Sequence, residues 1–377
     1  MRIGLVCPYN FYRPGGVQIC IREMAEELRK RGHYIRIIAP KPRKLPDVVD
    51  DDVILIGNSA ELKAFATKVD VGASVSNTKL EQILTEHQFD VIHFHEPGLP
   101  FLSMQLVGLS SAAHVATLHA TLPQGMVTKS YQTLMRPVAK YINTRVDVIS
   151  AVSPVAEATG RVYIPDATIT IVPNGIKLKD YKPKAPVKRS AGPKTIVYVG
   201  RLEKRKGVKY LLEAFALLRT EHNARLIIAG QGDLRPTLEA YVDKHDIKGV
   251  TFKGYVSEDE KITLMQKADL YCSPAPYGES FGIVLLEAMA AGTVVVAGNN
   301  PGYASVMTGK GRLSLVNPES TVDFAQRLEL MLYDEEVRSL WLKWAKQHVE
   351  QFDYVKVVDQ YEALYKKALR TRKARTT

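Results

Sequence analysis

The chain has 377 residues, 46% of them hydrophobic, so it is long enough to bury the cores of two domains of ordinary size. Its three cysteines are scattered and fit neither a disulfide framework nor a zinc-ligand spacing, which indicates a reducing compartment. A formal net charge of +11 favours an acidic partner: nucleotide phosphates, a nucleic acid or an anionic membrane face.

Short apolar segments alternate with amphipathic ones through the first half, a pattern typical of parallel sheets built from βα units. We expect the chain to open on such a strand and not on a signal peptide. Apolar residues from Val17 to Leu28 recur with a period of 3.6, which predicts a helix that ends at Gly32. The predicted strands of this half are 2–7, 34–39, 53–56, 91–95, 115–119 and 148–152.

The pattern changes near residue 173. The turn signal Pro173-Asn174-Gly175 is followed by a segment rich in Pro, Lys and Ala, 181–193, which we interpret as a linker. The alternation then resumes, and beyond residue 317 only helical patterns follow. The chain is thus predicted to be an α/β protein of two Rossmann-like, doubly wound domains, with a division at 172/173. The predicted strands of the second half are 195–199, 225–229, 250–252, 269–274 and 293–297.

Two carboxylates eight positions apart, Glu279 and Glu287, flank a predicted strand–loop–helix junction. The helix N-terminus offers free N–H groups to an anion. Glu279 in the loop and Glu287 two turns into the helix could then bind hydroxyl groups on either side of that anion. A phosphate flanked by two groups rich in hydroxyls is a nucleotide sugar. The alternative is an N-capping Glu279 and a surface Glu287. The same region, 281–297, is the longest apolar stretch, but Glu287 interrupts it, so no transmembrane helix is expected.

Two further loops suit phosphate groups. Arg201 and Lys206 lie in a loop between two glycines and could direct a guanidinium and an ammonium at one diphosphate. Gly15 and Gly16 open the first helix and remove side chains where the backbone could meet a phosphate. The alternatives are a solvated basic loop and a simple tight turn. No third glycine follows Gly16, so this is not a dinucleotide fingerprint.

Histidines end two predicted strands of the first half. His93 and His95 alternate along one strand and so share a face, with Glu96 directly after them. A metal site is conceivable there, but the buried setting disfavours it and we expect no metal. His119 ends the next strand and is better placed to contact hydroxyls of a ligand, the alternative being a structural histidine.

Together these motifs resemble glycosyltransferase family 4, the retaining GT-B enzymes, and the likeness spans nearly the whole chain. It implies two domains facing a central cleft. Residues 1–172 would form an acceptor-binding domain joined by a crossing helix within 353–377, and residues 173–352 a nucleotide-sugar-binding domain. Segments 7–9, 14–18, 93–97 and 279–285 further resemble the branch of this family that mannosylates phosphatidylinositol.

The resemblance also implies roles for single residues. Arg201 and Lys206 would stabilise the departing diphosphate, Glu287 would hold the ribose, and His119 would contact the donor sugar. The predicted catalytic residues are His119, Arg201, Lys206 and Glu279; the donor-binding residues are Gly15, Gly16, Arg201, Lys206, Glu279, Phe281, Gly282 and Glu287; and the acceptor-binding residues are Tyr9, Gln18 and Asn58. The family uses front-face attack, so neither a protein nucleophile, a metal nor a cofactor is expected beside the nucleotide-sugar substrate.

We therefore expect a hexosyltransferase that moves mannose from GDP-mannose to a lipid-linked or inositol-phosphate acceptor, as a peripheral protein on the cytoplasmic face of the plasma membrane. The alternatives are UDP-glucose-dependent transfer to diacylglycerol or to a cell-wall polysaccharide, and a small soluble acceptor. No nucleic-acid motif is present, so no nucleic-acid partner is expected.

Membrane binding is expected from the basic end of the chain, since each basic residue near an anionic bilayer contributes about 1 kcal/mol. The alternative is a solvated, frayed terminus. The six basic residues there are Lys366, Lys367, Arg370, Arg372, Lys373 and Arg375. Three departures from the mannosyltransferase pattern leave the acceptor open: Lys79 is the one base in 71–86, Glu61 and Lys63 follow Asn58, and Tyr12 replaces an aspartate.

Overall fold

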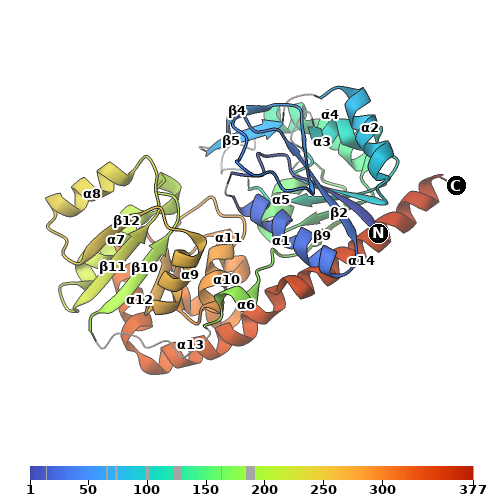
Figure 1. Cartoon of the computed structure of the whole chain (residues 1–377). Helices are drawn as coiled ribbons and strands as arrows, with labels where there is room; N and C mark the ends of the chain where they lie inside the picture. Colours follow the sequence, from blue (N-terminus) through green and yellow to red (C-terminus); the bar gives the residue numbers. More distant parts are fainter. Residues whose placement is uncertain are drawn as a thin grey trace. The chain divides into compact units, whose positions relative to one another are not determined.

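The computed structural model describes residues 1–13, 15–64, 67–72, 75–98, 102–121, 129–162, 164–183 and 192–376. The chain divides into two units, Met1–Gly175 with Tyr354–Thr377, and Ile176–Asp353 (Figure 1). The first boundary between the units, after Gly175, follows directly after the predicted turn at Pro173-Asn174-Gly175. The Pro- and Lys-rich segment 181–193 lies inside the second unit, so its interpretation as the join between domains is wrong. Its residues 184–191 lie outside the described residues, and Tyr181 at its start is buried.

Unit 1 contains a seven-stranded sheet in the order β3-β2-β1-β6-β7-β8-β9, in which every neighbouring pair is parallel. The strands are β1 (Arg2–Val6), β2 (Tyr34–Pro40), β3 (Val53–Ile56), β6 (Val91–His95), β7 (Ala113–Leu118), β8 (Val148–Ala151) and β9 (Ile169–Ile171). The central strands β6 and β7 are buried along their whole length, and this burial includes the polar residues His93 and His95 of β6 and His114 and Thr117 of β7. The strand order reverses between β1 and β6.

Helices cover both faces of this sheet. They are α1 (Gly16–Lys30), α2 (Asn77–His87), α3 (Leu102–Leu109), α4 (Lys129–Arg145), α5 (Pro154–Arg161) and α14 (Tyr354–Thr376). On one face α1 and α14 form a shared core, in which Met24 and Leu28 lie with Tyr361 and Tyr365. The C-terminal helix, red in Figure 1, therefore belongs to unit 1, and this part of the prediction is confirmed.

A two-stranded antiparallel hairpin, β4 (Ser59–Ala64) and β5 (Thr67–Gly72), was not predicted from the sequence. Its strands do alternate in the sequence, with apolar residues at Ala60, Leu62 and Ala64 and again at Val69 and Val71, but they are short and rich in Ala, Ser, Lys, Glu and Asp, which have low β-propensity. The hairpin starts directly after Asn58, and the side chains of Glu61 and Lys63 lie outside the described part of the chain. The short strands β9 and β15 were missed as well.

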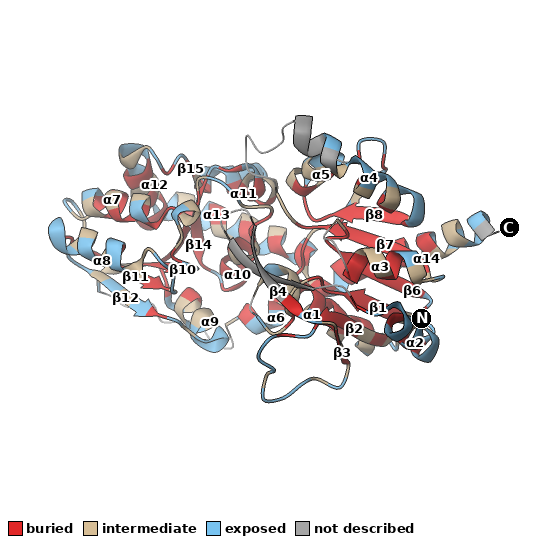
Figure 2. Ribbon diagram, turned by 90° about the horizontal axis from the view of Figure 1, so that it is seen from above, coloured by how far each residue is buried: buried red, intermediate tan, exposed pale blue. Residues whose placement is uncertain are grey.

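Unit 2 contains a six-stranded parallel sheet in the order β12-β11-β10-β13-β14-β15. Its strands are β10 (Lys194–Val199), β11 (Ala224–Ala229), β12 (Val250–Gly254), β13 (Leu270–Ser273), β14 (Val294–Gly298) and β15 (Leu315–Val316). Figure 2 shows the inner strand β14 buried and the edge strand β12 partly exposed. Here the strand order reverses between β10 and β13, so both units have the doubly wound topology predicted for them.

The helical segments of unit 2 are α6 (Leu178–Tyr181), η1 (Lys204–Lys206), α7 (Val208–Leu218), α8 (Arg235–Lys244), α9 (Glu258–Lys267), α10 (Ile283–Ala290), α11 (Pro301–Val306), η2 (Gly309–Ser314), α12 (Thr321–Tyr333), α13 (Glu335–His348) and η3 (Val349–Phe352). The capping box that opens α9, formed by Ser257 and Glu260, is the one that the sequence spacing indicates. Among the described residues, no helix combines the length and apolar character needed to span a bilayer.

The basic end of the chain is helical through Thr376 and is not frayed. Arg372 Nε lies 3.0 Å from Asp147 Oδ2, and Arg375 Nη1 lies 3.2 Å from Asp147 Oδ1. The Asp147 side chain is fully buried. Two of the predicted membrane-binding residues therefore bind a carboxylate of unit 1 itself.

Candidate active site

Most of the predicted site residues lie beside the point in each sheet at which the strand order reverses, whereas His119 follows β7 and Asn58 follows β3. In doubly wound sheets, ligands bind at this position because the loops on either side turn away from each other and leave a crevice. In unit 2 these loops follow β10 and β13, and in unit 1 they follow β1 and β6.

In unit 2 the structure brings Lys206 and Glu279 together, although 73 residues separate them along the chain. Lys206 Nζ donates to Glu279 Oε1 over 2.7 Å, and Arg205 Nη1 donates to the same oxygen over 2.8 Å. The side chains of Lys206 and Glu279 are only 15% and 12% exposed, so water screens this contact weakly. Two cations share one carboxylate, and the excess positive charge suits a diphosphate.

Arg201 joins this group through Glu203. Arg201 Nη1 lies 2.7 Å from Glu203 Oε1, while Glu203 Oε2 accepts from Arg205 Nε over 3.1 Å. The Arg201 side chain is half exposed. Sequence reasoning missed Glu203 and Arg205, although both lie in the motif that it singled out; the tight turn of η1 is what directs Arg205 toward Glu279.

Glycines hold the two loops close together. Gly207 has a φ of 70°, and a Cβ at this position would lie 2.3 Å from the carbonyl oxygen of Pro274. Gly282 has a φ of 111° and precedes α10, whose N-terminus has no side-chain cap. The Phe281 side chain is buried, and the contact predicted between the Phe281-Gly282 backbone and the donor sugar stays a prediction.

Glu287 is buried and is not the surface residue of the alternative interpretation. It is the fifth residue of α10, so it lies little more than one turn into the helix, and the predicted two turns were wrong because the loop runs on to Gly282. Glu287 Oε1 accepts from Lys261 Nζ and from the Tyr181 hydroxyl, each over 2.9 Å. Burial lowers the pKa of Lys261, but the carboxylates of Glu287 and Glu258 outweigh this effect and its pKa is raised.

Sequence reasoning also missed Tyr181 and Lys261. They lie 106 and 26 residues from Glu287, and no spacing rule connects them with it. They hold Glu287 in place, and its role as the ribose-binding carboxylate stays a prediction.

In unit 1 the loop after β1 meets the start of α1. Gly15 is extended, with φ −172° and ψ 157°, and Gly16 is the first residue of the helix, which has no side-chain cap. Gln18 Nε2 donates to the carbonyl oxygen of Asn10 over 3.2 Å and so joins the helix to the loop. Tyr9 packs against the core of α1 and α14, whereas Asn58 is exposed. The donor and acceptor roles predicted for these residues stay predictions.

His119 follows β7 and is almost fully buried. Its Nε2 lies 2.8 Å from His95 Nδ1, and its backbone N–H donates to Glu96 Oε1, which also accepts from the Ala120 N–H over 2.5 Å. Burial lowers the pKa of His119 to about 3 and raises the pKa of Glu96. His119 is therefore neutral at physiological pH. His93 is a satisfied buried histidine, bonded to Tyr365 and Thr117.

Comparisons with known proteins identify the family. Residues 14–180 match the family model of Glycosyltransferase Family 4, and residues 182–348 match that of Glycosyl transferases group 1. The phosphatidyl-myo-inositol mannosyltransferase of Mycolicibacterium smegmatis is 32% identical over 373 residues, which cover 97% of this chain and 93% of that protein. The chain belongs to glycosyltransferase family 4. It is a hexosyltransferase, as predicted.

Solved structures support the fold of this family 4 enzyme. The sucrose-phosphate synthase of Thermosynechococcus elongatus aligns with a TM-score of 0.74 at 21% identity and covers 97% of this chain and 98% of its own. Anabaena Alr3699/HepE in complex with UDP-glucose aligns with a TM-score of 0.72 at 19% identity and covers 96% of this chain and 98% of its own. The predicted GT-B fold is thereby confirmed.

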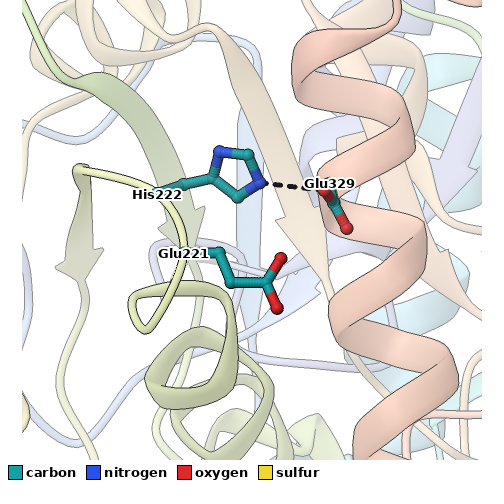
Figure 3. Close-up of side chains that lie close together, drawn as sticks. All are labelled: Glu221, His222 and Glu329. Atoms are coloured by element: carbon teal, nitrogen blue, oxygen red, sulfur yellow. Dashed lines mark hydrogen bonds and ion pairs between the residues drawn. The ribbon is translucent and has the colours of Figure 1, made fainter.

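Within the described residues of this family 4 enzyme, one group of side chains, Glu221, His222 and Glu329, has potential metal-ligand atoms within 4.8 Å of one another (Figure 3). It lies in the loop after α7 and on α12. His222 Nε2 pairs with Glu329 Oε1 over 2.9 Å, and its ring stacks on Tyr333 at 4.2 Å. These residues form a local ion pair outside the predicted site, and metal-independent transfer stays a prediction.

Proposed function

We propose that this family 4 enzyme transfers mannose from GDP-mannose to the inositol ring of a phosphatidylinositol-type lipid, with retention of configuration. The observation that carries the proposal is the likeness to the mycobacterial phosphatidyl-myo-inositol mannosyltransferase, which extends over 97% of the chain and so includes both units. The cationic group around Glu279 supports the donor half of the proposal, because it offers the excess positive charge that a diphosphate needs.

On the donor side, Arg201 and Lys206 bind the diphosphate and stabilise the negative charge that grows on it as the glycosidic bond breaks. Fixed cations act strongly here because they need no reorganisation during the reaction. Glu279 Oε1 is bonded to Lys206 and Arg205, which leaves Oε2 to accept from a sugar hydroxyl. Glu287 binds the ribose hydroxyls in this proposal.

Transfer proceeds without a protein nucleophile. The acceptor hydroxyl attacks the anomeric carbon from the face that the phosphate leaves. The bond between the anomeric carbon and the phosphate oxygen breaks, the new glycosidic bond forms, and the hydroxyl proton passes to the departing phosphate oxygen. Neutral His119 contributes a hydrogen bond to the donor sugar.

The exposed bases of α14 are proposed to bind the anionic face of the membrane. Lys366, Lys367, Arg370 and Lys373 are exposed, while Arg372 and Arg375 bind Asp147. The double variant Lys366→Glu/Lys367→Glu should lose sedimentation with phosphatidylglycerol vesicles and keep its melting temperature. Unchanged sedimentation would remove α14 from the membrane contact.

The donor is tested first with a thermal-shift panel of GDP, UDP and ADP and their hexose conjugates. A ligand at about 100 times its Kd stabilises the native state by about 2.7 kcal/mol. A shift with GDP and GDP-mannose alone supports the proposal, which is then completed by mass spectrometry of phosphatidylinositol vesicles incubated with enzyme and GDP-mannose. A shift with UDP-glucose alone overturns the mannose donor and favours diacylglycerol or a polysaccharide as acceptor.

A further inference from the structure

The rings of His95 and His119 meet where two neighbouring strands of unit 1 end. β6 and β7 are parallel, with His95 opposite Thr117, so the residue that follows β7 lies beside the end of β6. His95 Nδ1 is 2.8 Å from His119 Nε2, and the rings are stacked at 5.1 Å. Both side chains are buried. A contact of this kind holds a single proton, which belongs to one ring or the other.

The position of that proton follows from the surroundings of the other ring nitrogen of His95, Nε2. His95 Nε2 is buried and has no hydrogen-bond partner among the described residues. A buried N–H without an acceptor is rare in proteins, because it loses its bond to water, whereas an unpaired acceptor is tolerated more often. His95 Nε2 is therefore the bare nitrogen. The proton lies on His95 Nδ1 and is donated to His119 Nε2.

The tautomer of His119 follows. Its Nε2 accepts from His95, so its own proton lies on Nδ1. Burial lowers the pKa of His119 to about 3, and that of His95 well below its ordinary value, so neither ring carries a second proton at neutral pH. His119 then presents an N–H donor on the side away from His95.

Glu96 fixes the backbone that carries this ring. Its Oε1 accepts from the N–H groups of both His119 and Ala120, and the residue itself has a φ of 52°. A non-glycine residue holds that conformation only where its surroundings enforce it. Glu96 thus sets the position of the His119 main chain, while His95 sets the proton of its ring.

We propose that His95 is a positioning residue that locks His119 as the neutral Nδ1–H tautomer, so that His119 donates a hydrogen bond to an oxygen of the bound nucleotide sugar. The identity of that ligand rests on the proposed function. The tautomer does not, because it follows from contacts within unit 1 alone.

The tautomer is read directly from long-range ¹H–¹⁵N correlation spectra of the full chain labelled at histidine. His95→Asn and His119→Asn assign the two rings. The proposal expects a protonated Nδ1 and a bare Nε2 in both. A protonated Nε2 on His119, or an imidazolium at neutral pH, would overturn it. In His93→Gln, which alters the neighbouring buried histidine, the His119 pattern should persist while the melting temperature falls.

Steady-state kinetics of two His95 variants then distinguish a role of His95 in positioning His119 from a role in core packing alone. His95→Asn keeps an N–H donor near the Nδ1 position and should retain most of kcat, whereas His95→Leu removes the donor and should lower kcat by roughly tenfold to a hundredfold at nearly constant KM for the donor. Both variants should keep the GDP-induced thermal shift. Equal loss of kcat in both would contradict the proposal. If the wild type transfers no mannose, the proposed function fails, and the spectra still decide the tautomer.

Discussion

At the scale of single residues, the donor group of unit 2 is a chain of opposite charges that runs from Arg201 through Glu203 and Arg205 to Glu279 and Lys206. Each cation in it has a protein carboxylate as partner before any ligand binds. Ligand binding therefore exchanges or extends existing contacts, and single substitutions should separate the role of the cations from that of the carboxylates.

Lys206→Ala should weaken binding of bare GDP by about tenfold to a hundredfold, since a hydrogen bond from a charged group contributes about 1.5–3 kcal/mol. Isothermal titration calorimetry measures this change. Lys204→Ala is the matched control, because Lys204 lies in the same turn but is exposed. Equal effects of the two substitutions would mean that only the net charge of the loop matters.

Glu279→Gln should act in the opposite way on binding and on turnover. It removes the charge that partly neutralises Lys206 and Arg205, so affinity for GDP should stay the same or rise. The amide keeps one oxygen, which we expect to stay with Lys206 and Arg205, so an NH2 group replaces the carboxylate oxygen that accepts from the sugar hydroxyl, and kcat should fall on the order of a hundredfold. Steady-state kinetics combined with the GDP titration provide the comparison, and a parallel loss of both quantities would argue against a sugar-holding role.

At the scale of elements, the position of α10 depends on Gly282, because the residue combines a φ of 111° with a close approach to Tyr303. In Gly282→Ala the new Cβ would lie 2.7 Å from Tyr303 Cδ1. Gly292, at the other end of α10, has a φ of 74° and nothing within 4 Å of its Cβ position.

Both alanine substitutions should therefore cost about 1–2 kcal/mol of backbone strain, and Gly282→Ala about 1–3 kcal/mol more. Urea unfolding followed by tryptophan fluorescence measures the difference, since both tryptophans, Trp341 and Trp344, lie in α13 of the same unit. Equal destabilisation would show that the loop adjusts around the new methyl group.

At the scale of the whole molecule, the sequence predicts what is local or periodic. The parallel strands, the capping box at Ser257 and the helical end of the chain all follow from patterns within one element. The β4–β5 hairpin was missed although its strands alternate with period 2, because its apolar positions are few and include two alanines, so the local signal is weak.

In the candidate site, too, local features were predicted from the sequence and contacts between distant segments were not. The sequence singled out Lys206 and Glu279, but it held no signal for Lys261 or Tyr181, whose contacts with Glu287 arise only when distant segments pack. His95 and His119 were both noted, yet their mutual hydrogen bond depends on the register of β6 and β7. The spacing of residues within one segment thus predicted candidate site residues, whereas side-chain contacts between distant segments could not be predicted.

The buried histidines of unit 1 predict how its stability depends on pH. Burial lowers the pKa of His93 and His119 to about 3 and that of His114 to about 4, from an ordinary value of 6.5. Between the lowered pKa of each folded histidine and 6.5, the unfolded chain binds protons that the folded chain excludes. The free energy of unfolding of unit 1 is therefore unaffected by these histidines above pH 6.5. As the pH falls from 6.5 toward 3, this free energy decreases by about 1.4 kcal/mol per pH unit for each histidine.

Amide hydrogen exchange of β6 and β7, corrected for the intrinsic exchange rate, should accordingly show protection falling from pH 6.5 downward. His93→Gln should make this decline shallower, because one fewer proton is excluded from the folded state, even though its protection at neutral pH is lower. Protection that stays constant down to the range where carboxylates titrate, below about pH 4.5, would show that the histidines take up protons without unfolding unit 1.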